Sequence, residues 1–269
     1  MYLYIIMFVY FVCNINLHFF IEYIKSLQYN YKNVKLITNI EEIPIDHTSK
    51  YIFIQKVPNI PFFILDQKNF YLLNIEQLSK HEWVQYLSQT NMNIIDYSLA
   101  NIKCLAPYKE HIYYLPYMVN KDEIFNYKKI YDIATIGLWT DSYRLNITNQ
   151  LSNVSIIEGF GDARDDMLFK HKILLNVHFN ENFKIFEQIR CNRCIFNKMI
   201  VITEKSLDNN YELKDYIIEC DYDNLVSVTN DVLNNYDYYY NKIFKDFDIE
   251  KIEKMYKNNS DAFFMQKVI

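Results

Sequence analysis

The sequence predicts an α/β protein of two domains, each built around a parallel β-sheet. Between residues 130 and 235, short apolar segments alternate with helical patterns, as parallel sheets with helical crossovers require. Before residue 120 the strands and helices are spaced less regularly, and this half contains every proline of the chain. The polar, charged segment 121–129 lies between the two patterns and is typical of a linker. The length of 269 residues is sufficient for two such domains.

The first half begins with an almost wholly apolar segment, residues 1–13. It lacks the basic residues and the small-residue cleavage site of a signal peptide and is too short to span a bilayer, so it is interpreted as a buried first strand. Strands are predicted at 3–12, 34–38, 51–55, 93–96 and 111–115, and short apolar runs occur at 62–65 and 70–73. Helices are predicted at 17–27 and 76–87.

The second half alternates between strand and helix patterns. Strands are predicted at 132–137, 154–158, 173–179, 199–203 and 216–220, and helices at 142–151, 162–171, 183–196 and 223–234. The remaining segment, 236–269, is mainly helical and could pack back on the first domain or cap the second. The glycines of the chain, Gly137, Gly159 and Gly161, each follow a predicted strand. They indicate turns with positive φ, either as ordinary tight turns or where the backbone approaches a ligand closely.

The stretch 172–204 is the central strand–helix–strand unit of the second half. Its predicted loop and helix N-terminus lie at the carboxyl edge of the sheet, where open α/β folds bind ligands. Glu187 is expected in the first helical turn, with Arg190 one turn later. A carboxylate and a guanidinium at this edge suit a ligand with hydroxyls and phosphates, such as a sugar nucleotide. The alternative is a surface ion pair that complements the helix dipole.

Composition limits the classes of function. Apolar residues make up 51% and aromatic residues 17%, which is typical of a folded chain. The net charge of −5, without a basic stripe, argues against a nucleic-acid partner. The five cysteines form no disulfide framework and indicate a reducing compartment, the cytoplasm, which could be that of a host. Cys191 and Cys194 form a lone C-x-x-C without a second pair, so they are interpreted as packing residues.

Several phrases resemble a group of glycosyltransferases found in large DNA viruses and bacteria. They are YLLNIEQLS at 71–79, IIDYSLANI at 94–102, YLPYMVN at 114–120, IEGFGDARDDML at 157–168 and FEQIRCNR at 186–193. Residues 172–204 resemble the donor-binding segment of group-one and spore-maturation-type glycosyltransferases. The resemblance covers about residues 65–240 and implies the GT-B fold, in which two Rossmann-like domains face a cleft. These would be an acceptor-side domain at 1–120, a linker at 121–129, and a nucleotide-sugar-binding domain at 130–235.

The resemblance also implies an activity. The chain would transfer a sugar, as hexosyltransferases do, from a nucleotide-diphosphate donor to a glycan, protein or lipid acceptor. No metal ion or other cofactor and no stable insertion into a membrane are expected. Donor, acceptor, stereochemical outcome and oligomeric state stay open.

Residue roles follow from the same resemblance. In the families that the chain resembles, the carboxylate at the Phe-Glu position binds the ribose hydroxyls of the donor. Glu187 is the matching residue here, so the resemblance implies this role for it. Arg144, at the helix opening after Gly137, matches the basic residue that meets the diphosphate. Arg164 and Arg190 are further candidates for phosphate contacts, because guanidinium groups match phosphate geometry.

Three further groups of residues are candidates for the site. Gly137 and Gly159 would allow the backbone to approach the donor. Asn176 and His178, at the end of the central strand, could reach the sugar or the leaving phosphate, although His178 could equally be a hydrogen-bonded strand-end histidine. An inverting reaction needs a general base from the first half, for which Glu76 and Asp96 are the candidates. A capping role is the alternative for both.

The sequence departs from the family pattern in two places. Related retaining enzymes have two glutamates with seven residues between them, and counting back from Glu187 gives Phe179, while Glu181 is out of register. The glycine-rich loop that often follows the first strand is absent at 12–17. A catalytically inactive nucleotide-, sugar- or partner-binding protein with the GT-B fold is therefore the alternative. Another Rossmann-like enzyme is disfavoured, because the sequence has no G-x-G-x-x-G.

Overall fold

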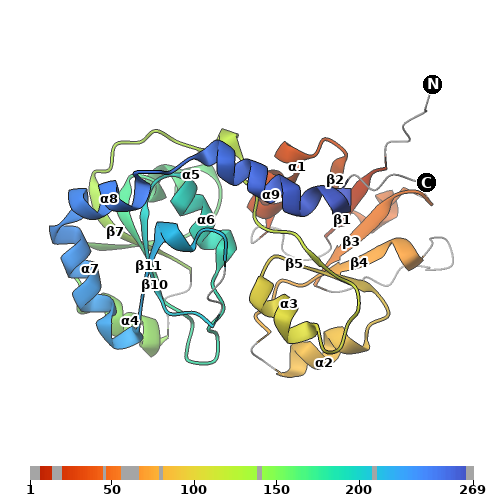
Figure 1. Cartoon of the computed structure of the whole chain (residues 1–269), viewed down its shortest axis with the longest axis horizontal. Helices are drawn as coiled ribbons and strands as arrows, with labels where there is room; N and C mark the ends of the chain where they lie inside the picture. Colours follow the sequence, from red (N-terminus) through yellow and green to blue (C-terminus); the bar gives the residue numbers. More distant parts are fainter. Residues whose placement is uncertain are drawn as a thin grey trace. The chain divides into compact units, whose positions relative to one another are not determined.

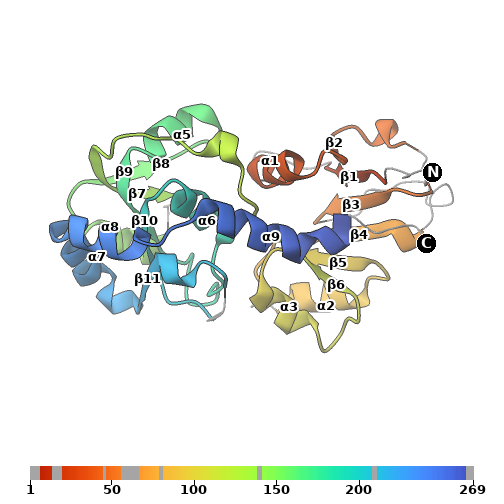
Figure 2. The ribbon, with the colours of Figure 1, turned by 45° about the horizontal axis from the view of Figure 1, so that its top comes forward.

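The computed structural model describes residues 7–13, 20–44, 47–55, 67–78, 81–137, 141–207 and 211–264. The chain divides into two compact units, one of Met1–Asn120 with Glu250–Ile269 and one of Lys121–Ile249 (Figure 1). Each unit is a parallel β-sheet flanked by helices, which Figure 2 shows from a second direction. The predicted α/β fold with two parallel sheets is therefore confirmed.

The first unit contains a six-stranded sheet in the order β2-β1-β3-β4-β5-β6, with every neighbouring pair parallel. The strands are β1 (Val9–Val12), β2 (Val34–Ile37), β3 (Lys50–Ile54), β4 (Phe70–Leu73), β5 (Asn93–Asp96) and β6 (Ile112–Tyr114). The helices are α1 (Ile21–Asn30), α2 (His81–Gln89), α3 (Leu99–Leu105) and the last helix of the chain, α9 (Ile249–Phe264). Short 3-10 turns occur at Ile40–Glu42 and Gln67–Asn69.

The central strands of this sheet are buried on both faces. All residues of β3 and β4 are buried, so their continuous apolar runs fit a parallel sheet covered on each side. On one face, aromatic and aliphatic side chains form a core under α2 and α3: Val12, Tyr51, Phe53, Phe70, Leu72, Leu78, Leu87, Ile94 and Leu105.

Helix α9 packs on the first unit through its last turn. The ring of Phe264 stacks on Tyr31 with centroids 4.0 Å apart, and the Tyr31 hydroxyl donates to Asp261 at 2.8 Å. The ring of Phe263 meets Tyr71 edge-on, and the ammonium of Lys50 lies 4.0 Å from its centroid. The C-terminal segment thus crosses back to the first domain, one of the two placements that its sequence allows.

The second unit contains a five-stranded parallel sheet in the order β11-β10-β9-β7-β8. Its strands are β7 (Tyr131–Ile136), β8 (Val154–Ile157), β9 (His171–Asn176), β10 (Ile200–Glu204) and β11 (Ile217–Cys220). Its helices are α4 (Ser142–Thr148), α5 (Asp162–Leu168), α6 (Gln188–Phe196), α7 (Leu225–Asn234) and α8 (Tyr236–Phe244). The 3-10 turns are η5 (Lys121–Glu123), η6 (Lys214–Tyr216) and η7 (Tyr222–Asn224).

The strand order reverses direction between β7 and β9. The chain runs from β7 outward to β8, then returns past β7 to β9, β10 and β11. Right-handed crossovers consequently place α4 on one face and α5 with α6 on the other, as Figure 1 shows. Because Ala134 pairs with Leu174, the carboxyl ends of β7 and β9 lie side by side. This edge is the topological switch point of the second sheet.

The predicted helix at 183–196 is wrong at its start, because α6 begins only at Gln188. The backbone N–H of Asn182 donates to the Asn180 side chain at 2.9 Å, and Phe183 N–H donates to the Asn180 carbonyl at 3.1 Å. An asparagine that binds its own backbone in this way competes with helix formation. Glu187 is therefore the N-cap residue rather than part of the first turn.

Other boundaries also differ from the prediction. The strand predicted to reach Phe179 ends at Asn176, and the helix predicted at 76–87 is α2, so Glu76 lies in the loop before it. The segment 236–269, predicted to be mainly helical, contains two helices, α8 and α9, with a break at 245–248. Asp248 directly precedes α9, at the N-cap position, where aspartate is a preferred residue. The apolar run 62–65, residues 3–6 and residues 17–19 lie outside the described residues.

Candidate functional site

Charged and polar side chains converge at the switch point of the second sheet. Gly137 follows β7, Asn176 ends β9, and Glu187 with Arg190 opens α6. Arg144 comes from the first turn of α4, where the Asp141 carboxylate accepts its N–H at 2.8 Å and caps the helix. Open α/β sheets bind ligands at this edge because loops and helix N-termini meet there.

Arg190 is the centre of this cluster. Its Nη1 donates to Asn176 Oδ1 at 3.0 Å and also forms an ion pair with the Glu187 carboxylate. Asn176 is fully buried and is held by Thr203 of β10, whose hydroxyl oxygen accepts from the asparagine Nδ2 at 3.0 Å. Arg190 and Glu187 keep 19% and 22% of their side chains exposed, so a ligand can reach both.

Because Gly137 has no side chain, the guanidinium of Arg190 can lie against its backbone. A Cβ at this position would lie 3.0 Å from Nη2 of Arg190 and 3.9 Å from Nη1 of Arg144. The φ of Gly137 is +107°, a conformation that residues with a Cβ rarely adopt. The glycine thus allows two guanidinium groups to gather against the end of β7.

Arg144 is buried and held by the backbone. Its Nε donates to the carbonyls of Val177 at 3.1 Å and His178 at 3.2 Å, and its guanidinium lies 5.4 Å from the centroid of the Phe179 ring. Burial lowers the pKa of Arg144, the nearby charge of Arg190 lowers it further, and Glu187 opposes both effects. Asp141 and Glu204 also raise the pKa of Arg144, so three carboxylates surround the two guanidinium groups. The planar guanidinium groups of Arg144 and Arg190 match the geometry of phosphate oxygens.

His178 connects this cluster to the neighbouring strand. Its backbone N–H donates to Glu204 Oε2 at 3.2 Å, and its Nε2 lies 3.3 Å from the Ser206 hydroxyl. Tyr143 donates its hydroxyl to the other oxygen of Glu204 at 2.7 Å. The pKa of His178 is lowered by burial, against the opposing charges of Glu187 and Glu204. The imidazole is therefore neutral at pH 7 and serves as an uncharged neighbour of the cluster.

Glu204 and Tyr143 are site residues that the sequence reasoning missed. Glu204 is 3% exposed and is the last residue of β10, after Ile200, Val201, Ile202 and Thr203. A charged residue at the carboxyl end of a buried parallel strand is the signal that could have identified it. Tyr143 could not be recognised among 25 tyrosines.

A pocket of about 770 Å³ lies beside the cluster. It is formed by the residues that follow β9, β10 and β11, together with Tyr143: Glu181, Lys184, Glu204, Lys205, Ser206, Leu207, Asp221, Tyr222 and Asp223. We refer to these residues with Tyr143 as the β10–β11 pocket. It is contiguous with the charged cluster because Glu204 and Ser206 contact His178.

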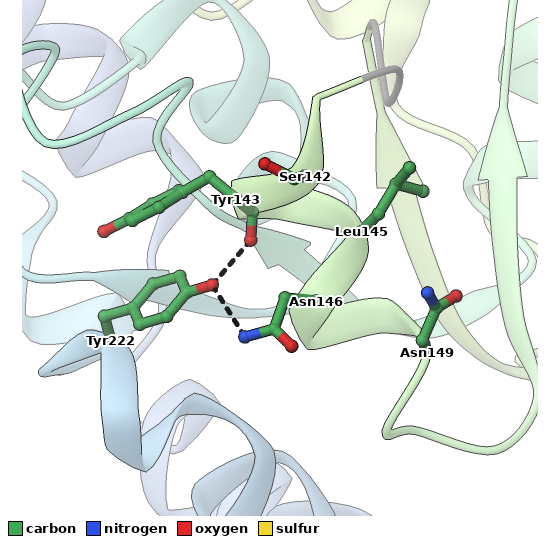
Figure 3. Close-up of a pocket in the computed structure, with 6 residues that line it drawn as sticks. All are labelled: Ser142, Tyr143, Leu145, Asn146, Asn149 and Tyr222. Carbon is green, nitrogen blue, oxygen red and sulfur yellow. Dashed lines mark hydrogen bonds between the residues drawn. The ribbon is translucent and has the colours of Figure 1, made fainter.

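A second, more open pocket of about 650 Å³ lies against α4 and is lined by Ser142, Tyr143, Leu145, Asn146, Asn149 and Tyr222 (Figure 3). Tyr143 and Tyr222 line both pockets. Their rings stack with centroids 4.1 Å apart. The Tyr222 hydroxyl donates to the Tyr143 carbonyl at 2.6 Å and accepts from Asn146 Nδ2 at 3.4 Å (Figure 3). This pair fixes the first turn of α4, and hence Arg144, against η7.

Arg164 does not lie with the other candidates. It forms a buried ion pair of 2.7 Å with Asp165, which also receives two bonds from Arg193. Arg193 in turn binds Glu123 at 3.0 Å, so the network fastens α5, α6 and η5 together. Gly159 has a φ of +85° with no atom within 4 Å of an added Cβ, and a turn alone explains this glycine. The structure supports Arg144 and Arg190, rather than Arg164, as the paired cations.

Glu76 and Asp96 lie near each other in the first unit. The Asn101 side chain donates both to the Glu76 carbonyl at 3.0 Å and to Asp96 at 3.1 Å. Asp96 is fully buried and also accepts from Asn74 at 2.7 Å and Ser98 N–H at 2.8 Å. Ser98, rather than Asp96, is the N-cap residue of α3. These contacts favour a structural role for Asp96, whereas Glu76 is half-buried and accepts from Gln55 at 2.7 Å.

Two further expectations concern metal binding and membrane insertion. Two Asp-x-Asp triplets, at 221–223 and 246–248, contain carboxylates of the kind that ligate divalent cations. Within the described ranges, no group of three His, Cys, Asp or Glu side chains is placed to hold a metal ion. None of the helices in this part of the chain is long and apolar enough to cross a membrane. Metal independence stays a prediction.

Solved structures with the same fold are glycosyltransferases and related proteins. The solved structure of WaaG, a glycosyltransferase involved in lipopolysaccharide biosynthesis, matches with a TM-score of 0.57 and 10% identity, over 94% of this chain and 99% of that chain. TarM matches with a TM-score of 0.51 and 12% identity, over 81% of this chain and 56% of that chain. The chain has the GT-B fold of these proteins.

Sequence similarity identifies the family. The chain is 34% identical over 215 residues to the uncharacterized protein R358 of Acanthamoeba polyphaga mimivirus, covering 76% of each protein. It is 30% identical over 244 residues to the uncharacterized mimivirus protein L140, covering 83% of this chain and 79% of L140. The chain belongs to this family of mimivirus proteins. No protein-family model matches the sequence.

Proposed function

We propose that the chain is a glycosyltransferase that transfers a sugar from a nucleotide-diphosphate donor. The observation that carries this proposal is the convergence of Arg144 and Arg190 at Gly137, beside Glu187, at the switch point of the second sheet. Paired guanidinium groups recognise a diphosphate, and a carboxylate recognises the vicinal hydroxyls of a ribose. The GT-B fold of the chain agrees with this use of the edge.

Each residue of the cluster has a separate role in the proposed reaction. Arg144 and Arg190 bind the diphosphate and stabilise the charge that it gains as the glycosidic bond breaks, which is the electrostatic contribution that dominates many enzymes. Glu187 orients the ribose, and Asn176 fixes the guanidinium of Arg190. In this proposal, residues 172–204 act as the donor-binding segment of group-one and spore-maturation-type glycosyltransferases does.

The remaining features of the proposal concern the acceptor and the compartment. The acceptor is a glycan, protein or lipid, the reaction needs no metal ion, and the protein acts in the cytoplasm without a nucleic-acid partner. For an inverting reaction Glu76 is the better general base, because Asp96 has three hydrogen-bond donors and no exposed surface. His178, as a neutral imidazole, would lie beside the leaving group.

One observation favours a catalytically inactive binding protein as the second candidate. Position 179, where related retaining enzymes have a carboxylate, holds Phe179, whose ring packs over the Arg144 guanidinium. A ring in this place shields the cation but cannot stabilise a developing positive charge on a sugar. The inactive protein would keep the nucleotide site and lose turnover.

Thermal unfolding in the presence of nucleoside diphosphates and sugar nucleotides tests the proposal. A ligand that binds only the folded state raises Tm by mass action, and no acceptor is required. We expect one nucleoside diphosphate and its sugar conjugates to raise Tm in the parent but not in Glu187→Ala. Release of sugar from that donor, measured with and without EDTA, then distinguishes an enzyme from an inactive binder and tests metal independence.

A further inference from the structure

The β10–β11 pocket is a second ligand site beside the proposed diphosphate cluster. We propose that it receives the sugar of the donor and selects a neutral, hydroxyl-bearing sugar over an acidic one. This inference rests on the proposed function, because the sugar is attached to the diphosphate that Arg144 and Arg190 would hold.

Hydrogen bonds link Arg144 of the cluster to Tyr143 of the pocket through His178 and Glu204. Arg144 donates to the His178 carbonyl, His178 N–H donates to Glu204, and Glu204 accepts from the Tyr143 hydroxyl. Tyr143 precedes Arg144 in α4, so one helical turn contributes to both sites. The pocket therefore adjoins the cluster, and the proposal places the sugar of a donor bound at the cluster in this pocket.

The chemistry of the lining suits a sugar. Tyr143 and Tyr222 supply aromatic rings, while Glu181 and Lys184 of the loop after β9 and Ser206 of the loop after β10 supply hydrogen-bonding groups. A few polar groups converging from different elements on one cavity are typical of a small-molecule site. The volume of about 770 Å³ is larger than a single hexose needs, so the acceptor hydroxyl can share the same space.

The charge of the lining sets the preference among sugars. Four carboxylates line the pocket, from Glu181, Glu204, Asp221 and Asp223, against two ammonium groups, from Lys184 and Lys205. Lys205 lies 3.7 Å from Asp221 and is partly neutralised by it. A sugar carboxylate would face this excess of negative charge, whereas sugar hydroxyls can donate to the carboxylates.

Glu181 and Asp223 are the residues to change. Both are exposed, so their substitution spares the fold, and both lie outside the diphosphate cluster. By contrast, Glu204 is 3% exposed and accepts from Tyr143 and His178, so its loss would disturb the pocket as a whole. Asp237 of α8 is an exposed carboxylate in the same unit that lines neither pocket, and Asp237→Asn is the matched control.

The experiment measures Kd by calorimetry for UDP, UDP-glucose and UDP-glucuronate, and for GDP, GDP-mannose and GDP-mannuronate. In the parent we expect the neutral conjugate of the preferred nucleotide to bind about tenfold more tightly than its uronate, a difference of about 1.4 kcal/mol. In Glu181→Gln/Asp223→Asn the preference should fall to less than about threefold, with the Kd of the free diphosphate unchanged. Asp237→Asn should retain the preference of the parent.

Two results would overturn the inference while leaving the proposed function intact. One is a uronate that binds as tightly as the neutral sugar, and the other is an unchanged preference in the double variant. If none of UDP, GDP, ADP, CDP and TDP binds to the folded parent, the diphosphate site itself fails, and the sugar pocket fails with it.

Discussion

The guanidinium of Arg190 lies where a side chain at Gly137 would begin, with Nη2 3.0 Å from the ideal Cβ position. The two residues come from different elements, the turn after β7 and the first turn of α6, and meet because the strand order reverses between β7 and β9. The partly exposed ion pair of Arg190 with Glu187 therefore depends on a glycine at position 137, where φ is +107°.

Gly137→Ala should weaken nucleotide binding and lower stability. The new methyl group displaces Arg190, and the positive φ strains any residue with a Cβ by about 1–3 kcal/mol. Gly161→Ala is the matched control, because Gly161 has a φ of +75° with no atom within 4 Å of an added Cβ. Both variants should show a lower free energy of unfolding in urea, but only Gly137→Ala should lose nucleotide affinity. Equal affinity in the two variants would contradict the arrangement.

Arg144→Gln and Arg164→Gln should separate the binding cation from the structural one. Both arginines are buried, at 3% and 7% exposure, so each substitution should cost about 1–3 kcal/mol of stability. Arg164 is bound to Asp165 within the α5–α6 network, and its loss should leave the Kd for a nucleoside diphosphate unchanged. Loss of Arg144 should weaken binding at least tenfold. An effect of Arg164→Gln on Kd would place the anion site elsewhere.

Asp96 should make the stability of the protein depend on pH. Burial raises the pKa of Asp96 from 3.8 to about 7, against the lowering effect of the Asn74, Ser98 and Asn101 donors. Between these values the folded state holds a proton that the unfolded state has released, so the free energy of unfolding falls as pH rises from about 4 to about 7. The difference between the pKa of Asp96 in the unfolded and folded states corresponds to a change of roughly 4 kcal/mol in the free energy of unfolding.

Asp96→Asn removes this titration and is the variant that tests it. Relative to the parent, its free energy of unfolding in urea should increase as pH rises from about 4 to about 7, and the difference should level off above the folded-state pKa. Parallel pH profiles for the two proteins would show that the three donors hold Asp96 ionised throughout. Nucleotide affinity should be the same in both, because Asp96 belongs to the first unit.

The two parallel sheets were predictable because buried strands are continuous apolar runs. β3, β4 and β10 are buried at every position, and such runs are visible in the sequence. The start of α6 was not predictable, because the Asn180 turn overrides a helical apolar spacing through a hydrogen bond to its own backbone. The long helix predicted after 236 likewise missed the break before α9.

The candidate site was predictable only where residues are near in sequence. Glu187 and Arg190 form the expected i, i+3 pair, and Gly137 and Asn176 lie at the expected strand ends. The contacts of Arg190 with Gly137 and of Glu204 with Tyr143 join segments separated by tens of residues, and only the sheet order brings them together. Arg164 was assigned to the site by residue type, and the network that Asp165 forms with Arg164 and Arg193 could not be identified without the packing of α5 on α6.

Binding of a nucleoside diphosphate and of pyrophosphate to the parent, Glu187→Gln and Arg190→Gln tests the donor-site assignment most directly. Because Glu187 is assigned to the ribose, Glu187→Gln should weaken nucleoside diphosphate binding by about tenfold or more and leave pyrophosphate binding equal or tighter. Arg190→Gln should weaken both ligands, since its guanidinium is assigned to the phosphates. If the folded parent binds neither ligand, or if Glu187→Gln weakens pyrophosphate as much as the nucleotide, the assignment of this cluster to a nucleotide-sugar donor is wrong.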